Sequence, residues 1–208
     1  MKTFLFQGDS ITDCGRDRNN DKNLGLGYPF LFASDYSLKF PYEYNFINKG
    51  VSGDRIVDVY ARIKRDIINI RPDYMSLLIG VNDVWHEVSY RNGVDAPKFE
   101  MIYSMLIEEI TAALPEIKIF LLEPFVLQGT ATTEAWGYFK EETKLRAEAV
   151  KRIADKYGLT FIPLQEKFNN SVKSQNTAYW LVDGVHPAPA GHALIKEALS
   201  EEFDKTEK

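Results

Sequence analysis

The sequence contains only one cysteine, Cys14, in 208 residues, so no disulfide bond can form within the chain. It contains no run of about 18 apolar residues, the length that a membrane-spanning helix requires. The apolar stretch near the N-terminus, Thr3–Phe6, is too short for a secretory signal peptide. These absences predict a cytoplasmic protein without a membrane partner.

The chain also lacks an excess of positive charge and the common ligand-binding signatures. The chain has 25 basic and 30 acidic residues and a net charge of -5, with both signs interspersed, which argues against a nucleic-acid partner. It has no Gly-x-Gly-x-x-Gly and no Gly-Lys-Ser/Thr segment, and Tyr90 stands where a His-Glu-x-x-His zinc motif beginning at His86 would need its second histidine. We therefore expect no nucleotide, no other organic cofactor and no metal.

Short apolar stretches alternate with longer amphipathic ones along the chain. The short stretches are rich in β-branched or aromatic residues, which predicts buried strands at Thr3–Phe6, Tyr44–Ile47, Tyr74–Ile79, Ile117–Leu122 and Leu159–Ile162. Helical spacing of apolar residues and flanking glycine or proline predict helices at Gly27–Lys39, Asp54–Ile70, Pro97–Leu114, Ala135–Tyr157 and Pro189–Phe203. In the helix over Asp54–Ile70, Arg62 and Asp66 are expected away from the centre of the apolar face.

This alternation predicts an α/β protein with a parallel sheet covered by helices on both faces. No repeat, low-complexity tract or change of composition divides the chain, so residues 1–208 are expected to form a single domain. Ligands of such sheets bind outside the carboxyl ends of the strands, so the loops that follow the strands are expected to carry the chemistry.

Ser10 follows the first predicted strand, within the polar segment Gly8–Ile11. A serine on a tight turn can expose its hydroxyl to a cleft, but it needs an adjacent base to act as a nucleophile. Taken alone, such a serine is more often a helix N-cap. Ser52 is an alternative nucleophile, but Asp54 stands where a Gly-x-Ser-x-Gly elbow needs its second outer glycine. We expect Ser52 to help cap the helix that starts near Asp54.

The base is sought among the three histidines, His86, His186 and His192. His186 lies three residues after Asp183, a spacing that can place both side chains on one side of a turn or short helix. The carboxylate would then orient the imidazole and stabilise its protonated form. An ordinary Asp-Gly turn is the alternative for Asp183, and a structural role in the last helix is expected for His192.

Acyl transfer also requires hydrogen-bond donors for the developing oxyanion. Asn82, after the third predicted strand, offers a side-chain amide, and Gly50, after the second, offers a backbone N–H that no Cβ shields. Either residue alone is ordinary loop composition. Their placement after separate strands, together with a serine and an aspartate–histidine pair, favours a hydrolase.

The polar segments, taken in order, resemble the four sequence blocks of the SGNH (GDSL-type) hydrolase superfamily. Gly8–Ile11 is similar to the nucleophile block, with isoleucine in place of leucine, and the other blocks resemble Asn48–Gly53, Gly80–Asp83 and Asp183–Pro187. The resemblance implies a flavodoxin-like three-layer α/β/α sandwich with a five-stranded parallel sheet. It also implies a catalytic triad of Ser10, His186 and Asp183 and an oxyanion hole of the Ser10 and Gly50 N–H groups with the Asn82 amide.

Finer features resemble bacterial intracellular acetyl-xylooligosaccharide esterases of this superfamily; they are Trp85 with His86, Leu122–Phe125 and Trp180–Pro187. This narrower resemblance implies a serine esterase that removes O-acetyl groups from a small acetylated oligosaccharide, with Asp9 and Trp85 at the substrate. Core packing or a subunit contact is the alternative for Trp85, which leaves a homo-oligomer open, and packing is expected for Trp180.

Two other functions stay open. A lysophospholipase or thioesterase would use the same residues on longer acyl chains, although no amphipathic lid is evident. A carbohydrate-binding or interaction protein on the same fold would show no turnover. The complete set of nucleophile, base, orienting carboxylate and oxyanion donors argues against this second alternative.

Overall fold

The computed structural model describes residues 1–174 and 176–207. All strands of its sheet are parallel and lie in the order β2-β1-β3-β4-β5. Their bounds are β1 Lys2–Gly8, β2 Tyr44–Asn48, β3 Tyr74–Leu78, β4 Lys118–Leu122 and β5 Thr160–Ile162. Each strand coincides with a predicted one to within two residues at either end, which confirms the five-stranded parallel sheet.

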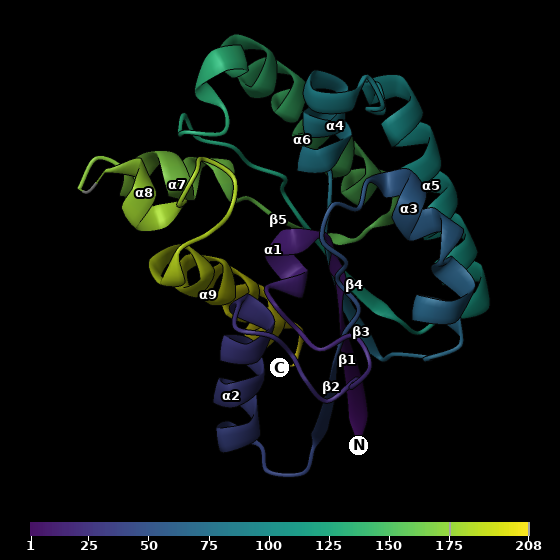
Figure 1. Cartoon of the computed structure of the whole chain (residues 1–208). Helices are drawn as coiled ribbons and strands as arrows, with labels where there is room; N and C mark the ends of the chain where they lie inside the picture. Colours follow the sequence, from purple (N-terminus) through teal and green to yellow (C-terminus); the bar gives the residue numbers. More distant parts are fainter. Residues whose placement is uncertain (175, 208) are drawn as a thin grey trace.

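Successive side chains of a strand face opposite sides of the sheet, so two apolar cores form. Phe4 and Phe6 pack with α2 (Tyr28–Lys39) and α9 (Pro189–Thr206) on one side. Leu5 belongs to the core on the other side, under the helices α3 Ile56–Ala61, α5 Ala96–Ala113 and α6 Trp136–Tyr157. Figure 1 shows these helices as two layers with the sheet between them, which confirms the three-layer α/β/α class.

Shorter helical segments follow several strands. They are α1 Ser10–Asp13, α4 Val81–Tyr90, α7 Gln165–Ser171, α8 Thr177–Trp180, the 3-10 turn η2 Thr133–Ala135 and the π-helical turn η1 Lys64–Ile68. One residue separates β1 from α1, and two residues separate β3 from α4. The helix α4 was not predicted, because the polar residues at its start have the composition of a loop.

The segment predicted as one helix over Asp54–Ile70 is instead two helical pieces, α3 and η1. Asp66 in η1 is only 4% exposed rather than away from the core. Arg62 Nε donates to Asp66 Oδ2 at 2.8 Å, and Arg65 Nε donates to Asp66 Oδ1 at 2.7 Å. These ion pairs offset the cost of burying a carboxylate, an effect that apolar periodicity does not register.

Phe203 on α9 is the centre of an aromatic cluster and is 1% exposed. Its ring centroid lies between 5.0 and 6.0 Å from those of Phe4, Phe32, Tyr36, Tyr44, Tyr74 and Phe120. Because so many rings contact Phe203, replacing it tests how much the core between α2, α9 and the sheet contributes to stability.

Phe203→Ala is expected to lower the free energy of unfolding by about 3–5 kcal/mol, because it removes buried apolar surface and leaves a cavity. The measurement is urea denaturation followed by circular dichroism. Leu38→Ala on α2 is the control; that side chain is 83% exposed, so the expected change is within about 0.5 kcal/mol. Equal losses in both variants would contradict this description of the core.

Candidate active site

Ser10 lies where β1 turns into α1. The strand ends at Gly8, Asp9 is the N-cap of the helix, and Ser10 is its first residue. A Cβ on Gly8 would lie 2.3 Å from Leu78 O and 2.4 Å from Thr12 Oγ1, so the turn requires glycine. The Ser10 side chain is half-buried at the carboxyl edge of the sheet. Its N–H is at the start of a helix and has no intrahelical acceptor.

His186 and Asp183 reach Ser10 from the loop before α9. Ser10 Oγ lies 2.9 Å from His186 Nε2, and His186 Nδ1 lies 2.7 Å from Asp183 Oδ2. The other carboxylate oxygen, Asp183 Oδ1, accepts from the backbone N–H groups of Val185 at 2.9 Å and His186 at 2.8 Å. These bonds fix the loop in a turn. The structure thus brings together the three residues predicted to be catalytic.

Burial and hydrogen bonding set the charges of this group. The hydrogen bond to Asp183 is the main cause that raises the pKa of His186 above its ordinary value, against an opposing effect of desolvation. Burial alone would raise the pKa of Asp183, but hydrogen bonds from the His186 ring and from the backbone of His186 and Val185 lower it to about 2. With Asp183 ionised and the imidazole neutral, Nδ1 donates to the carboxylate and Nε2 is the acceptor for the Ser10 hydroxyl.

Asn82 lies in the first turn of α4, after β3, and β3 is a neighbour of β1 in the sheet. Its side chain is 6% exposed, and Nδ2 donates to Asp54 O at 3.1 Å. A carboxamide has two N–H groups, so the bond to Asp54 orients the amide and leaves one N–H with no partner among residues 1–174 and 176–207. A fixed, partly desolvated donor of this kind is what oxyanion stabilisation needs.

Gly50 lacks the free N–H that was predicted for it. The N–H donates to Asn48 Oδ1 at 2.9 Å, and the carbonyl of Gly50 accepts from Arg16 Nε at 2.8 Å. A Cβ at this position would lie 2.5 Å from the backbone nitrogen of Asp13. Gly50 therefore lets its loop pack closely against α1, and its prediction as an oxyanion donor is wrong because the N–H is already bonded.

Gly53, in the same loop, has the property predicted for Gly50. Asp54 N donates to Val51 O at 3.1 Å, which closes a turn with Gly53 at its third position and a φ of 87°. The Gly53 N–H bonds to none of the residues in 1–174 and 176–207. The Ser-Gly-Asp segment of the predicted block was the available signal for this second glycine.

Ser52 ties this turn to α1 and does not cap α3. Its backbone N–H and its hydroxyl both donate to Asp13 Oδ2, at 2.9 and 2.8 Å. Asp13 lies on the same short helix as Ser10. The turn that carries Gly53 is therefore held on one side by α1 and on the other by the bond between Asn82 and Asp54.

Asp9 is buried in the turn and not exposed to a substrate. It is 1% exposed, and its Oδ1 accepts from the Ile11 N–H at 3.0 Å. Burial raises the pKa of Asp9 to about 7, and this hydrogen bond and His186 offset the rise only in part. The predicted substrate contact of Asp9 is wrong in this structure, because the side chain caps α1.

Of the tryptophans and histidines considered from the sequence, Trp85 lies beside the site, whereas Trp180 and His192 pack in the core. Trp85 is half-buried, with its ring centroid 5.7 Å from that of His186 and 6.0 Å from that of Phe139, so one part of it packs while the other lies beside the imidazole. Trp180 packs against the core that contains α9. His192 is 5% exposed, and its Nδ1 accepts from the Tyr28 N–H at 3.2 Å, which confirms a structural role.

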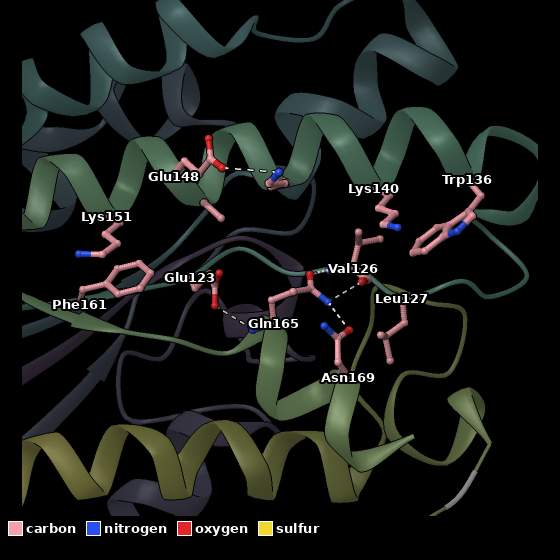
Figure 2. Close-up of a pocket in the computed structure, with 12 residues that line it drawn as sticks. Glu123, Val126, Leu127, Trp136, Lys140, Glu148, Lys151, Phe161, Gln165 and Asn169 are labelled. Atoms are coloured by element: carbon pink, nitrogen blue, oxygen red, sulfur yellow. Dashed lines mark hydrogen bonds and ion pairs between the residues drawn. The ribbon is translucent and has the colours of Figure 1, made fainter. Parts of the chain in front are cut away.

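A separate pocket of about 430 Å³ lies between α6 and α7 (Figure 2). Figure 2 shows Gln165 at its centre, bonded to Val126 and Asn169. Leu127 also lines the pocket and donates its N–H to Gly184 O at 2.8 Å, so the pocket adjoins the loop of Asp183. None of the described residues that line it is a member of the Ser10 group.

The comparisons with known proteins agree with this arrangement. The model of the GDSL-like lipase/acylhydrolase family matches residues 6–194. The chain belongs to this family. It is 32% identical to the acetylxylan esterase of Geobacillus stearothermophilus, over 96% of this chain and 93% of that relative. The protein is accordingly a carboxylic ester hydrolase.

Solved structures resemble this GDSL-family esterase over nearly its whole length. A protein described as a GDSL-like lipase from Parabacteroides merdae has 32% identity and a TM-score of 0.90, covering 96% of this chain and 94% of that chain. The Geobacillus acetylxylan esterase has 31% identity and a TM-score of 0.86, covering 97% and 93%. Structures of its catalytic mutants replace a serine, an aspartate or a histidine by alanine.

The aspartate and histidine replaced in those mutants lie three residues apart, as Asp183 and His186 do.

Within the described part of this esterase, no helix has both the length and the apolar character needed to cross a membrane.

The raised pKa of His186 predicts an acid limit to the esterase activity. As the predicted base, His186 would have to be neutral to accept the Ser10 proton, and its bond to Asp183 favours the charged form. The kcat/KM is therefore expected to fall by about tenfold per pH unit below this pKa. Asp183→Asn removes the charge that raises the pKa, so the acid limb should move to lower pH, while kcat drops by about 10⁴.

The measurement is the pH–rate profile of p-nitrophenyl acetate hydrolysis from about pH 5 to pH 9, which spans the usual histidine range. A flat profile would contradict a histidine base. An acid limb that stays at the same pH in Asp183→Asn would contradict the coupling of the two side chains.

Proposed function

We propose that this esterase removes acetyl groups from small carbohydrates, with Ser10 as nucleophile, His186 as general base and Asp183 as the carboxylate that orients His186. The observation that carries the proposal is the continuous chain of hydrogen bonds, 2.9 Å from Ser10 Oγ to His186 Nε2 and 2.7 Å from His186 Nδ1 to Asp183 Oδ2. The catalytic mutants of the Geobacillus acetylxylan esterase, at a serine, an aspartate and a histidine, support it.

Acylation begins when His186 Nε2 takes the Ser10 proton as Oγ attacks the ester carbonyl. Asp183 keeps its negative charge, because its pKa is about 2, and stabilises the imidazolium that forms. When the ester C–O bond breaks, His186 gives the proton to the leaving sugar hydroxyl. The acetyl group then remains on Ser10 Oγ.

The negative oxygen of the tetrahedral intermediate is stabilised by three donors, the N–H groups of Ser10 and Gly53 and the free amide N–H of Asn82. Each of them comes from a different loop at the carboxyl edge of the sheet. The bond of Asn82 to Asp54 and the bonds of Ser52 to Asp13 hold these loops in place before a substrate arrives. Donors that are fixed in advance need no reorganisation during the reaction.

Deacylation repeats the same steps with water. His186 takes a proton from a water molecule, which attacks the acetyl carbonyl, and the same donors stabilise the second intermediate. Ser10 Oγ leaves and regains its proton from His186. Acetate departs, and the hydroxyl and imidazole return to their starting states.

The carbohydrate part of the proposal rests on Trp85 and on the relatives. The half-buried Trp85 ring lies beside His186, where an aromatic face can stack on a sugar ring. The curated relative is an acetylxylan esterase. The apolar pocket between α6 and α7 has none of the three proposed catalytic residues in its lining, so it gives no support to an acyl tunnel that opens at Ser10.

Replacing the proposed catalytic groups should give graded losses of activity. Ser10→Ala is expected to lower kcat for p-nitrophenyl acetate by about 10⁴–10⁶, and Asn82→Ala by about 10²–10³. Asn170→Ala on α7, an exposed asparagine, is the control and should keep the activity of the original protein. Thermal unfolding of each variant separates loss of activity from loss of fold, and a near-native rate in folded Ser10→Ala would remove Ser10 as the nucleophile.

Acyl-chain preference tests the acetyl assignment. Each added methylene gains about 0.8 kcal/mol only where a dry pocket buries it, so kcat/KM is expected not to rise from acetyl to octanoyl p-nitrophenyl esters. Acetylated xylooligosaccharides, with acetate release measured directly, should be hydrolysed as well. A steady rise with chain length would replace the proposal by a lysophospholipase or thioesterase.

A further inference from the structure

A basic pocket of about 470 Å³ adjoins the turn Val51–Asp54 that carries Gly53. Val51 is part of its wall, and its cationic lining consists of Arg16, Arg18, Lys49, Arg62 and Arg65. These residues come from three separate segments, the loop after α1, the loop after β2 and the junction of α3 with η1. The net charge of the whole chain is -5, so this concentration of positive charge is a local feature.

Carboxylates pair with most of these cations. The pairs are Arg18 with Asp13, Lys49 with Asp21, Arg62 with Asp54 and Asp66, and Arg65 with Asp66. Four carboxylates therefore stand against five cations. In the described part of the chain, the pocket keeps one positive charge in excess.

The excess charge belongs to Arg16. This side chain is 8% exposed and forms no ion pair within residues 1–174 and 176–207. Its Nε donates to Gly50 O, whereas Nη1 is enclosed and has no hydrogen-bond partner among the described residues. A buried guanidinium without a counter-ion is costly, and an anion bound in the pocket would remove that cost.

The pocket is joined to the proposed catalytic group by direct contacts. Arg16 holds Gly50 in place, and Arg18 pairs with Asp13, which lies on the same short helix as Ser10. The turn between Val51 and Asp54 is thus shared, since it forms a wall of the pocket and carries the proposed oxyanion donor Gly53. The pocket wall at Val51 and the proposed oxyanion donor Gly53 are therefore two residues apart on one turn.

We propose that this pocket binds the carboxylate of an acidic sugar within the oligosaccharide whose acetyl group is presented to Ser10. Guanidinium groups match carboxylates with two parallel hydrogen bonds. Small-molecule sites measure about 300–1,000 Å³, so a volume of about 470 Å³ suits a sugar residue better than an inorganic ion. The sugar part of this inference rests on the proposed function, whereas the anion site rests on the arginines alone.

The test compares kcat/KM for acetylated xylooligosaccharides with and without a uronic acid substituent. The acidic substrate is expected to be preferred by about ten- to a hundredfold, the range of hydrogen bonds to charged groups. Arg16→Gln should lower this preference by about tenfold. Since that variant also loses the bond to Gly50 and risks misfolding, Arg65→Gln at the exposed rim is the second variant, with an expected loss of about two- to fivefold.

Arg152→Gln is the matched control, because it removes another exposed arginine, which pairs with Glu100 between α6 and α5 and does not line the pocket. It should leave the preference for the acidic substrate unchanged. A preference near one in the original protein would overturn the inference. An equal preference for the acidic substrate in Arg65→Gln, Arg152→Gln and the original protein would also overturn the inference.

Titration calorimetry with glucuronate and with inorganic sulfate separates this inference from the proposed function. If neither oligosaccharide is hydrolysed, the proposed function fails. The anion site is still supported in that case if glucuronate binds and its binding weakens in Arg65→Gln but not in Arg152→Gln. Absence of saturable glucuronate binding would then overturn it. Sulfate binding as tight as glucuronate binding would overturn the acidic sugar and leave a site for free anions.

Discussion

Gly8 has no room for a side chain, and the position of Ser10 depends on this constraint. The chain must turn from β1 into α1 while Gly8 lies against the backbone of Leu78 and the side chain of Thr12. Any Cβ would push β1 and β3 apart at the edge where the polar loops meet. Because the turn is this tight, the Ser10 hydroxyl comes within hydrogen-bonding distance of an imidazole 176 residues further along the chain.

Buried carboxylates hold the loops around Ser10. Asp13 accepts from Ser52, and Asp83 accepts from the Ile56 N–H at 3.1 Å and so fixes the start of α3. Asp54 pairs with Arg62, and its backbone carbonyl orients Asn82. Each of these contacts joins two loops, so the proposed oxyanion donors are positioned by polar bonds that lie largely out of water, where such bonds are stronger.

The same acidic residues explain how a basic pocket coexists with a stable fold. Asp13 and Asp54 contact both the loops of the site and the surrounding arginines, and Asp66 pairs with Arg62 and Arg65. They neutralise Arg18, Arg62 and Arg65 in place, whereas Arg16 keeps its charge for a ligand. Substrate recognition and catalysis would then use opposite ends of one hydrogen-bonded network.

The sequence by itself determined the strands, most of the long helices and the group of Ser10, Asp183 and His186. The strands, the helices and the Asp183–His186 pair are local features, because short apolar stretches and helical spacing reflect burial, and residues three apart can share a turn. Ser10 is 176 residues from His186, and it was grouped with the pair through the resemblance of its segment to the nucleophile block. Only the tertiary structure decided which glycine of the Gly50–Gly53 loop has a free N–H, that Asp9 and Asp66 are buried, and that five cations share one pocket. Those outcomes depend on partners from distant segments, such as Asn48 and Arg16 at Gly50 or Arg62 at Asp66. A hydrogen bond made across the fold has no periodicity along the chain from which it could be read.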